Sequence, residues 1–221
     1  MRNLLIFLTI ALFIPNLAMA KTIKIAVIDT GFDFRYVNSV KLCNSGHKDF
    51  SSSSLQDSHG HGTNIAGLIA RDLKKVDYCL MILKFTTGKP NPKSIINFLN
   101  ALQYAANLKP DIINISGGGQ EFEQIEKTIV YRILSNGTKL IVASGNDGNN
   151  LDKNCNFFPA CYYPEIIVVG NKAKSSNYGK IVDFVLDGNN QTAFGITMSG
   201  SSQSTAIHTN TVIKELSREQ H

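Results

Sequence analysis

Short apolar runs alternate along this chain with longer segments of helical periodicity, a pattern that only a few folds accommodate. The apolar runs are Thr22–Ile28, Tyr78–Phe85, Asp111–Ile115, Lys139–Ala143 and Ile166–Val169. Short continuous apolar runs are typical of strands buried on both faces of a parallel sheet. The alternation therefore predicts an α/β fold, in which a mostly parallel sheet carries helices on both faces and forms three layers.

Two segments between these runs, Pro92–Leu108 and Glu121–Leu134, are predicted helices. Their apolar stripes consist of Ile95, Phe98, Leu99, Leu102 and Ala106 in the first and of Phe122, Ile125, Ile129 and Ile133 in the second. Residues three and four apart share one face of a helix. We therefore interpret both stripes as core and not as parts of a binding site.

The first twenty residues have the pattern of a secretory signal peptide. Arg2 precedes the apolar run Leu4–Ile14, and the small-residue site Ala18-Met19-Ala20 follows. A run this short does not span a bilayer, although an uncleaved membrane anchor is the alternative. We expect residues 1–20 to be removed, residues 21–221 to form one domain, and the product to be secreted or periplasmic without stable membrane insertion.

The composition and charge of the chain are those of an ordinary globular domain. Apolar residues make up 43% of the 221 residues and charged residues 18%. Loss of Arg2 with the signal lowers the formal net charge from +5 by one. Lysine and arginine are scattered and no run of like charges appears, so no nucleic-acid partner is expected.

Four cysteines in an exported chain indicate disulfides. They allow three pairings. Cys155 and Cys161 bracket a short loop that can close on itself, which would leave Cys43 to pair with Cys79. No Cys-x-x-Cys spacing occurs, which argues against a zinc site.

Three short segments supply a carboxylate, an imidazole and a hydroxyl. Asp29 follows the first predicted strand directly, whereas His61 and Ser202 precede the predicted helices Gly62–Leu73 and Gln203–Leu216. Ligands of open α/β sheets bind beyond the carboxyl ends of the strands, and helix N-termini favour anionic oxygen. The order Asp, His, Ser is one of three known orders of a serine-nucleophile triad.

The chain resembles the subtilisin-like (S8) serine peptidases over four segments. The matching segments are Lys24–Gly31, His61–Gly67, Ala143–Gly148 and Met198–Ala206. The second is similar to the family's His-Gly-Thr-His-Val-Ala-Gly, and the fourth to its Gly-Thr-Ser-Met-Ala. The resemblance extends from Lys24 to about Ile213 and implies a subtilisin-like fold.

The resemblance implies an exported serine endopeptidase that acts through an acyl-enzyme intermediate on a protein or peptide substrate. It assigns Ser202 as the nucleophile, His61 as the general base and Asp29 as the residue that orients the histidine ring. By the same resemblance, Asn146 donates to the oxyanion. Ser116-Gly117-Gly118 resembles the family's edge that pairs with the substrate backbone.

Three alternatives remain at this point. His59 is the nearest competitor of His61 for the role of base. Asn146 and Ser202 have simpler interpretations as a turn residue and a helix cap. A catalytically silent subtilisin-like module that binds peptides is the second functional hypothesis. An esterase is disfavoured because Gly200–Ser204 is not a Gly-x-Ser-x-Gly elbow.

The sequence differs from the family pattern in ways that bear on how the protein is regulated and on whether it binds a metal ion. Asn64 and Ser201 depart from the histidine and threonine common in the family. No segment between Ala20 and the first strand has room for a propeptide, so we expect the chain to fold unaided. Narrow substrate choice, a separate inhibitor or a helper protein would then restrain it. No cofactor is expected, and no Asp-x-Asx-x-Asx-Gly loop indicates where structural calcium would bind.

Overall fold

A computed structural model of the protein describes residues 21–89 and 91–220, so the expected signal peptide lies outside the described residues. The chain forms a seven-stranded sheet in the order β2-β3-β1-β4-β5-β6-β7, with all neighbours parallel. Its strands are β1 (Ile23–Asp29), β2 (Lys48–Asp49), β3 (Tyr78–Lys84), β4 (Ile112–Ile115), β5 (Lys139–Ala143), β6 (Ile167–Asn171) and β7 (Phe184–Leu186). A separate antiparallel hairpin joins β8 (Gln191–Ala193) to β9 (Ile196–Met198).

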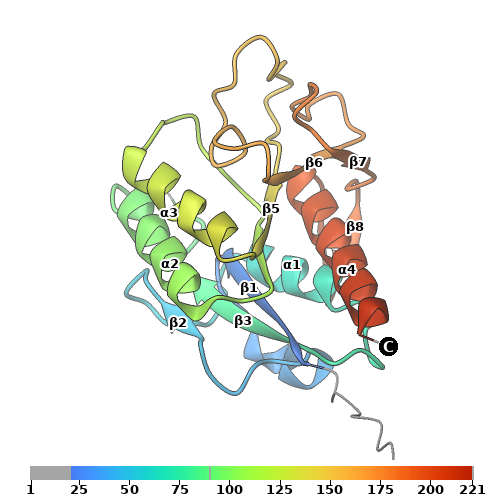
Figure 1. The fold of residues 1–221 in the computed structure, drawn as a ribbon. Helices are drawn as coiled ribbons and strands as arrows, with labels where there is room; N and C mark the ends of the chain where they lie inside the picture. The colour runs from blue at the N-terminus through green and yellow to red at the C-terminus, as the bar shows by residue number, and fades with distance from the viewer. Residues whose placement is uncertain (1–20, 90, 221) are drawn as a thin grey trace, which may run out of the picture.

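Four α-helices and one 3-10 helix complete the fold. They are η1 (Phe34–Ser39), α1 (His61–Ile69), α2 (Ser94–Leu108), α3 (Gln124–Ser135) and α4 (Ser201–Glu219). Helices α2 and α3 cover one face of the sheet, and α1 and α4 cover the other (Figure 1). The predicted three-layer α/β fold is therefore confirmed.

Strand β1 explains why the sheet sequences are apolar without alternation. Ala26 and Ile28 face the core beneath α2 and α3, whereas Ile25 and Val27 face the core beneath α1 and α4. All four are at most 1% exposed, because both faces of the strand are covered. Burial on both faces selects a continuous apolar run.

The register of the central strands brings the candidate site residues to one edge. Ile28 of β1 pairs with Ile115 of β4, and Ile115 pairs with Val142 of β5. Asp29 and Ser116 therefore lie side by side, and the loop after Ala143 begins at the same edge. This edge is the carboxyl end of the parallel strands, where α/β proteins bind ligands.

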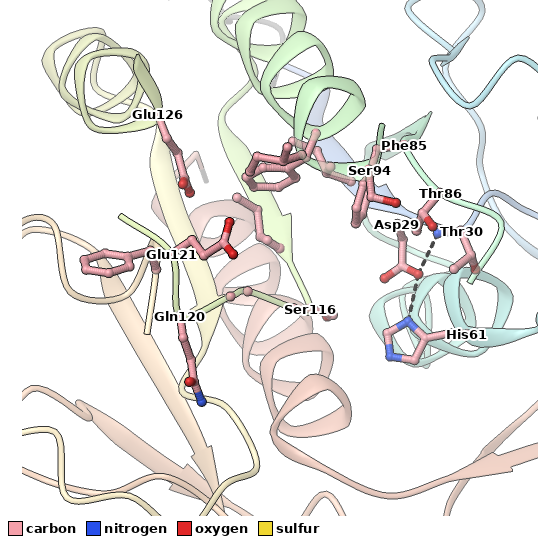
Figure 2. Close-up of a pocket in the computed structure, with 18 residues that line it drawn as sticks. Asp29, Thr30, His61, Phe85, Thr86, Ser94, Ser116, Gln120, Glu121 and Glu126 are labelled. Atoms are coloured by element: carbon pink, nitrogen blue, oxygen red, sulfur yellow. Dashed lines mark hydrogen bonds and ion pairs between the residues drawn. The ribbon is translucent and has the colours of Figure 1, made fainter. Parts of the chain in front are cut away.

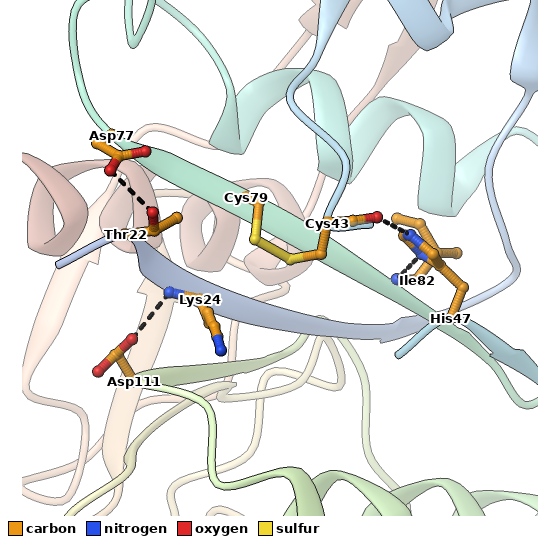
Figure 3. The surroundings of a disulfide bond; sticks show 8 residues. All are labelled: Thr22, Lys24, Cys43, His47, Asp77, Cys79, Ile82 and Asp111. Atoms are coloured by element: carbon orange, nitrogen blue, oxygen red, sulfur yellow. Dashed lines mark hydrogen bonds between the residues drawn. A yellow bond between two sulfur atoms is a disulfide. The ribbon is translucent and has the colours of Figure 1, made fainter. Parts of the chain in front are cut away.

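The four cysteines form two disulfides, in the pairing that the loop lengths suggested. Cys43 pairs with Cys79 across 36 positions and Cys155 with Cys161 across 6. The first bond attaches the segment around Cys43 to β3, where His47 also accepts a hydrogen bond from the backbone of Ile82 (Figure 3). On the chain-entropy model these loops contribute about 4 and about 2 kcal/mol.

Several details differ from the sequence predictions. Helix α1 ends at Ile69 and not at Leu73, because the chain turns at Asp72 with φ of 60°. The interpretation of both helical stripes as core was wrong in part, since Ile95 is 36%, Phe122 53% and Ile125 63% exposed. Within residues 21–89 and 91–220, no helix is both long and apolar enough to cross a membrane.

Candidate active site

Asp29 and His61 meet at the carboxyl edge of the sheet. His61 Nδ1 lies 2.7 Å from Asp29 Oδ1, and the Asp29 side chain is only 5% exposed (Figure 2). The same carboxylate oxygen accepts a hydrogen bond from the Thr30 amide at 2.7 Å. Because Nδ1 faces the carboxylate, the neutral ring carries its proton there and Nε2 is left as the acceptor.

The electrostatics of His61 follow from its burial and its neighbours. Burial lowers the pKa of the imidazole, but the charge of Asp29 and the hydrogen bond to it outweigh that effect. Asp57 adds a smaller contribution in the same direction, so the pKa of His61 lies above its ordinary value. The Asp29 carboxylate therefore stabilises the protonated form of the His61 ring.

Asp57 organises the turn that presents His61, and sequence reasoning missed it. Its carboxylate accepts five hydrogen bonds, from the amides of His59, Gly60 and Thr63 and from the hydroxyls of Thr30 and Thr63. Burial raises the pKa of Asp57, but these bonds together hold it below its ordinary value. The Asp-x-x-Gly-x-Gly-Thr spacing was the available signal, since an aspartate before a helix satisfies its first amides.

Gly62 is required by close packing at the start of α1. A Cβ atom there would lie 2.3 Å from the Gly31 carbonyl oxygen and 3.2 Å from Asp29 Oδ1. The Gly62 amide also donates to the Thr30 hydroxyl at 2.8 Å. A side chain at this position would separate α1 from β1 and move His61 away from Asp29.

Ser202 lies in the first turn of α4, against the end of β4. Its hydroxyl donates to the Ser116 carbonyl oxygen at 2.7 Å, and the Ser116 hydroxyl donates to the Ser202 carbonyl oxygen at 3.1 Å. These bonds hold Ser202 at the residue that follows β4, at the same edge of the sheet as the end of β1. Among the described residues, no hydrogen bond joins the Ser202 hydroxyl to His61.

Asn146 approaches α4 from the loop after β5. Its Oδ1 accepts a hydrogen bond from the Ser201 amide at 2.9 Å, which places the side-chain amide group at the start of α4. The loop is fixed by buried Asn177, whose Oδ1 accepts from the amides of Asp147 and Asn149. Asn146 is a prediction from its motif, whereas Asn177, thirty-one positions later, has no recognisable pattern and was missed.

His59 lies outside this arrangement. Its ring centre is 6.3 Å from that of His61, and the ring packs against Gly88, where a Cβ atom would lie 2.3 Å from it. Among the described contacts, His61 and not His59 has a carboxylate partner for its ring. The geometry favours His61 as the base.

A cleft of about 550 Å³ opens beside Asp29 and His61. The expected substrate-binding residues Ser116, Gly117 and Gly118 form part of its wall. The next residue, Gly119, pairs with Phe158 in an antiparallel bridge that holds this edge in place. Within the described residues, no group of three or more His, Cys, Asp or Glu side chains is arranged to hold a metal ion.

The model of the subtilase family (peptidase S8) matches residues 20–218. The chain belongs to the subtilase family. The solved structure of a cold-adapted subtilisin-like serine proteinase has a TM-score of 0.73 to this subtilase at 21% identity, over 90% of this chain and 76% of the other. That likeness concerns the fold.

Two curated relatives come from Bacillus subtilis (strain 168). This subtilase is 30% identical over 189 residues to the major intracellular serine protease, covering 77% of this chain and 59% of the relative. It is 30% identical over 203 residues to the minor extracellular protease Epr, covering 84% of this chain and 30% of the relative. The chain therefore spans less than two thirds of the length of either relative.

Proposed function

We propose that this subtilase is an exported serine endopeptidase with Asp29, His61 and Ser202 as its catalytic triad. The observation that carries the proposal is the 2.7 Å contact between Asp29 and His61 at the edge where Ser202 lies in the first turn of α4. Membership of the subtilase family supports the same reading. The substrate is a protein or peptide.

In the first half of the reaction, the Ser202 Oγ attacks the carbonyl carbon of the bond to be cut. His61 Nε2 takes the hydroxyl proton, and Asp29 stabilises the imidazolium without being protonated. The tetrahedral oxyanion accepts hydrogen bonds from the Asn146 side-chain amide and from the Ser202 backbone amide, at the positive end of α4. The C–N bond then breaks, and His61 returns the proton to the leaving amine.

In the second half, water attacks the acyl group on Ser202. His61 accepts a proton from that water and gives it to Ser202 Oγ as the ester bond breaks, which releases the acid and restores the enzyme. The Ser116-Gly117-Gly118 edge holds the substrate by main-chain hydrogen bonds, as an added strand. Such pairing supplies affinity with little sequence selectivity.

The hydrogen bond from Ser202 to Ser116 favours a second candidate, a silent module that binds peptides without cutting them. We place it second because a rotation about the Cα–Cβ bond of Ser202 redirects the hydroxyl at small cost. Catalytic hydrogen bonds often form fully only when the substrate is bound. Hydrolysis distinguishes the two candidates directly.

Export to the periplasm or the medium is supported by the signal-like residues 1–20 and by two disulfides. The names of the relatives include both an intracellular and an extracellular protease. Expression of the full chain in a secreting host, followed by N-terminal sequencing, tests this part. Export predicts an extracytoplasmic product that begins at Lys21, and retention in the cytoplasm with Met1 intact would refute it.

The proposed activity is tested by peptide hydrolysis with three variants. Ser202→Ala and His61→Ala should each abolish turnover, with losses on the order of the 10⁶ known for subtilisin, because the triad acts as a unit. His59→Ala is the matched control and should retain activity. Turnover that survives Ser202→Ala in purified protein would refute the assignment, and folded wild type that hydrolyses no peptide would favour the silent module.

A further inference from the structure

The cleft beside the proposed triad extends to a buried glutamate. Asp29 and His61 lie on one side of the cleft, and Glu121 and Glu126 lie on the other (Figure 2). The walls between them are largely apolar and consist of Ile28, Phe85, Ile95, Phe98, Ile115 and Phe158. A substrate side chain that reaches Glu126 therefore belongs to a residue at some distance from the bond that is cut.

Glu126 is unusual among the charged residues of the chain. It lies in the first turn of α3, is only 3% exposed, and directs its carboxyl group into the cleft (Figure 2). Its Oε1 is buried without a hydrogen-bond partner, a condition that only one other side-chain atom of the described residues shares. An unsatisfied buried polar atom is costly to stability and points to a missing partner.

The hydrogen-bond donor of the other carboxylate oxygen, Glu126 Oε2, is shared with a second acceptor. The Tyr162 hydroxyl lies 3.0 Å from Glu126 Oε2 and 3.2 Å from the Glu123 carbonyl oxygen. One hydroxyl carries one proton, so it donates to only one of these acceptors at a time. The carboxyl group of Glu126 therefore has less than one full donor for its two oxygens.

The charges around Glu126 define the missing partner. Burial raises the pKa of Glu126 to about 7, the Tyr162 hydrogen bond opposes that shift, and the nearby charge of Glu123 adds to it. Glu121 lines the same cleft, and none of the described residues that line it is lysine or arginine. Lys127, the next residue of α3, lies instead against the rings of Phe122 and Tyr163.

We propose that Glu126 determines substrate specificity by binding the cationic side chain of an arginine or lysine at a position removed from the cleaved bond. The cation supplies the donor that Oε1 lacks and compensates the acidic cleft, through a charge-assisted hydrogen bond. Its methylene stem packs on the apolar walls. Arginine is the better ligand, because its planar group donates at two points and stacks on aromatic rings such as Phe98 and Phe158.

This inference rests on the proposed peptidase function, and one experiment separates the two. Fluorogenic octapeptides carry a single arginine moved through every position of an otherwise neutral sequence, with norleucine in its place as the uncharged reference. The ratio of kcat/KM for arginine to norleucine is measured for wild type, Glu126→Gln and Glu126→Asp. Glu165→Gln is the control, since it removes the same charge from an exposed position outside the cleft.

The expected result is a preference for arginine of roughly 10- to 100-fold at one position, the range of a hydrogen bond to a charged group. Glu126→Gln should reduce that ratio to about one, Glu126→Asp should retain part of it, and Glu165→Gln should leave it unchanged. Equal use of arginine and norleucine by wild type at every position would overturn the inference. So would a preference that survives Glu126→Gln.

Peptide binding to the Ser202→Ala protein tests the proposed role of Glu126 even if the wild-type protein cleaves no peptide. Binding of the arginine and norleucine peptides is measured by calorimetry with Ser202→Ala alone and combined with Glu126→Gln. A preference for arginine that Glu126→Gln removes supports the inference, even if wild type hydrolyses nothing and the proposed function fails. Equal affinity of Ser202→Ala for both peptides overturns the inference and leaves the proposed function standing.

Discussion

Replacement of Glu126 by glutamine removes a buried ionisable group while it preserves the shape of the side chain. The pKa of Glu126 is raised from 4.5 to about 7 in the folded chain, first because the carboxyl group is buried. A carboxylic acid whose pKa is raised by folding destabilises the folded state wherever it must ionise. Below pH 4.5 both states hold the proton and no penalty exists.

Between pH 4.5 and about 7 the unfolded chain loses this proton and the folded chain keeps it, so the wild-type fold loses stability as the pH rises. Above about pH 7 both states are ionised and the full penalty of ~3 kcal/mol applies. Glu126→Gln has no such penalty. Its free energy of unfolding, relative to wild type, should therefore increase by ~3 kcal/mol between pH 4.5 and pH 8.

Urea unfolding over this pH range measures the difference, with Ser202→Ala in both proteins to prevent self-digestion. Other titrating groups cancel because the two proteins share them. Glu165→Gln is again the control, and its difference from wild type should stay within roughly 0.5 kcal/mol. A Glu126→Gln difference that does not change between pH 4.5 and pH 8 would show that Glu126 is not buried without adequate partners.

Three further predictions concern the proposed active site. Asn146→Ala should lower kcat by about 10²–10³ with little change in KM, because the side-chain amide of Asn146 donates to the oxyanion and not to the ground-state substrate. Steady-state kinetics measure both constants, and a change confined to KM would contradict this prediction. With a neutral peptide as substrate, kcat/KM should fall as the pH drops through the pKa of His61, which Asp29 raises above its ordinary value of 6.5. A pH profile of kcat/KM with its midpoint at or below pH 6.5 would contradict the effect of Asp29 on His61. Asp57→Ala should lower the free energy of unfolding by about 2 kcal/mol and reduce kcat, since five hydrogen bonds at the start of α1 lose their acceptor. A urea unfolding curve equal to that of wild type would show that the turn does not depend on Asp57.

The central strands and the edge of the sheet expected to carry the site could be predicted because both depend on local patterns, whereas the order of the strands in the sheet came only from the structure. Asp29 follows an apolar run directly, and glycines flank His61, so each could be assigned to an edge before any coordinates were known. The short elements could not be predicted in the same way. β2 has 2 residues, and β7, β8 and β9 have 3 each, which is too short for any periodicity to appear.

Helix α3 shows why Glu126 was missed. The sequence interpretation placed Phe122, Ile125, Ile129 and Ile133 toward the core, and it passed over Glu126 because the residue is charged. The buried residues of α3 are instead Glu126, Ile129, Val130 and Ile133, a regular helical stripe that starts at the glutamate. Ile125 is exposed although it is apolar, and Glu126 is buried although it is charged, which is the reverse of what their polarity predicts. Such exceptions concentrate at functional sites, where local rules yield to function.

The contacts of Asp57 and Asn177 were beyond sequence reasoning for another reason. Each is a polar side chain whose role depends on backbone amides that only the folded loops bring within reach. Asparagine and aspartate in loops are common, so their type alone does not distinguish a loop organiser from an ordinary turn residue.

In the proposed mechanism, Ser202 is a nucleophile activated by His61 and Asp29. Labelling with a fluorophosphonate probe, followed by mass spectrometry of the digested protein, tests it most directly, because the probe forms a bond only with an activated serine. If Ser202 is the nucleophile, we expect one adduct on the peptide that contains Ser202, no adduct in Ser202→Ala and a strongly reduced yield in His61→Ala. Folded wild-type protein that remains unlabelled, or that is labelled at a different serine, would contradict it.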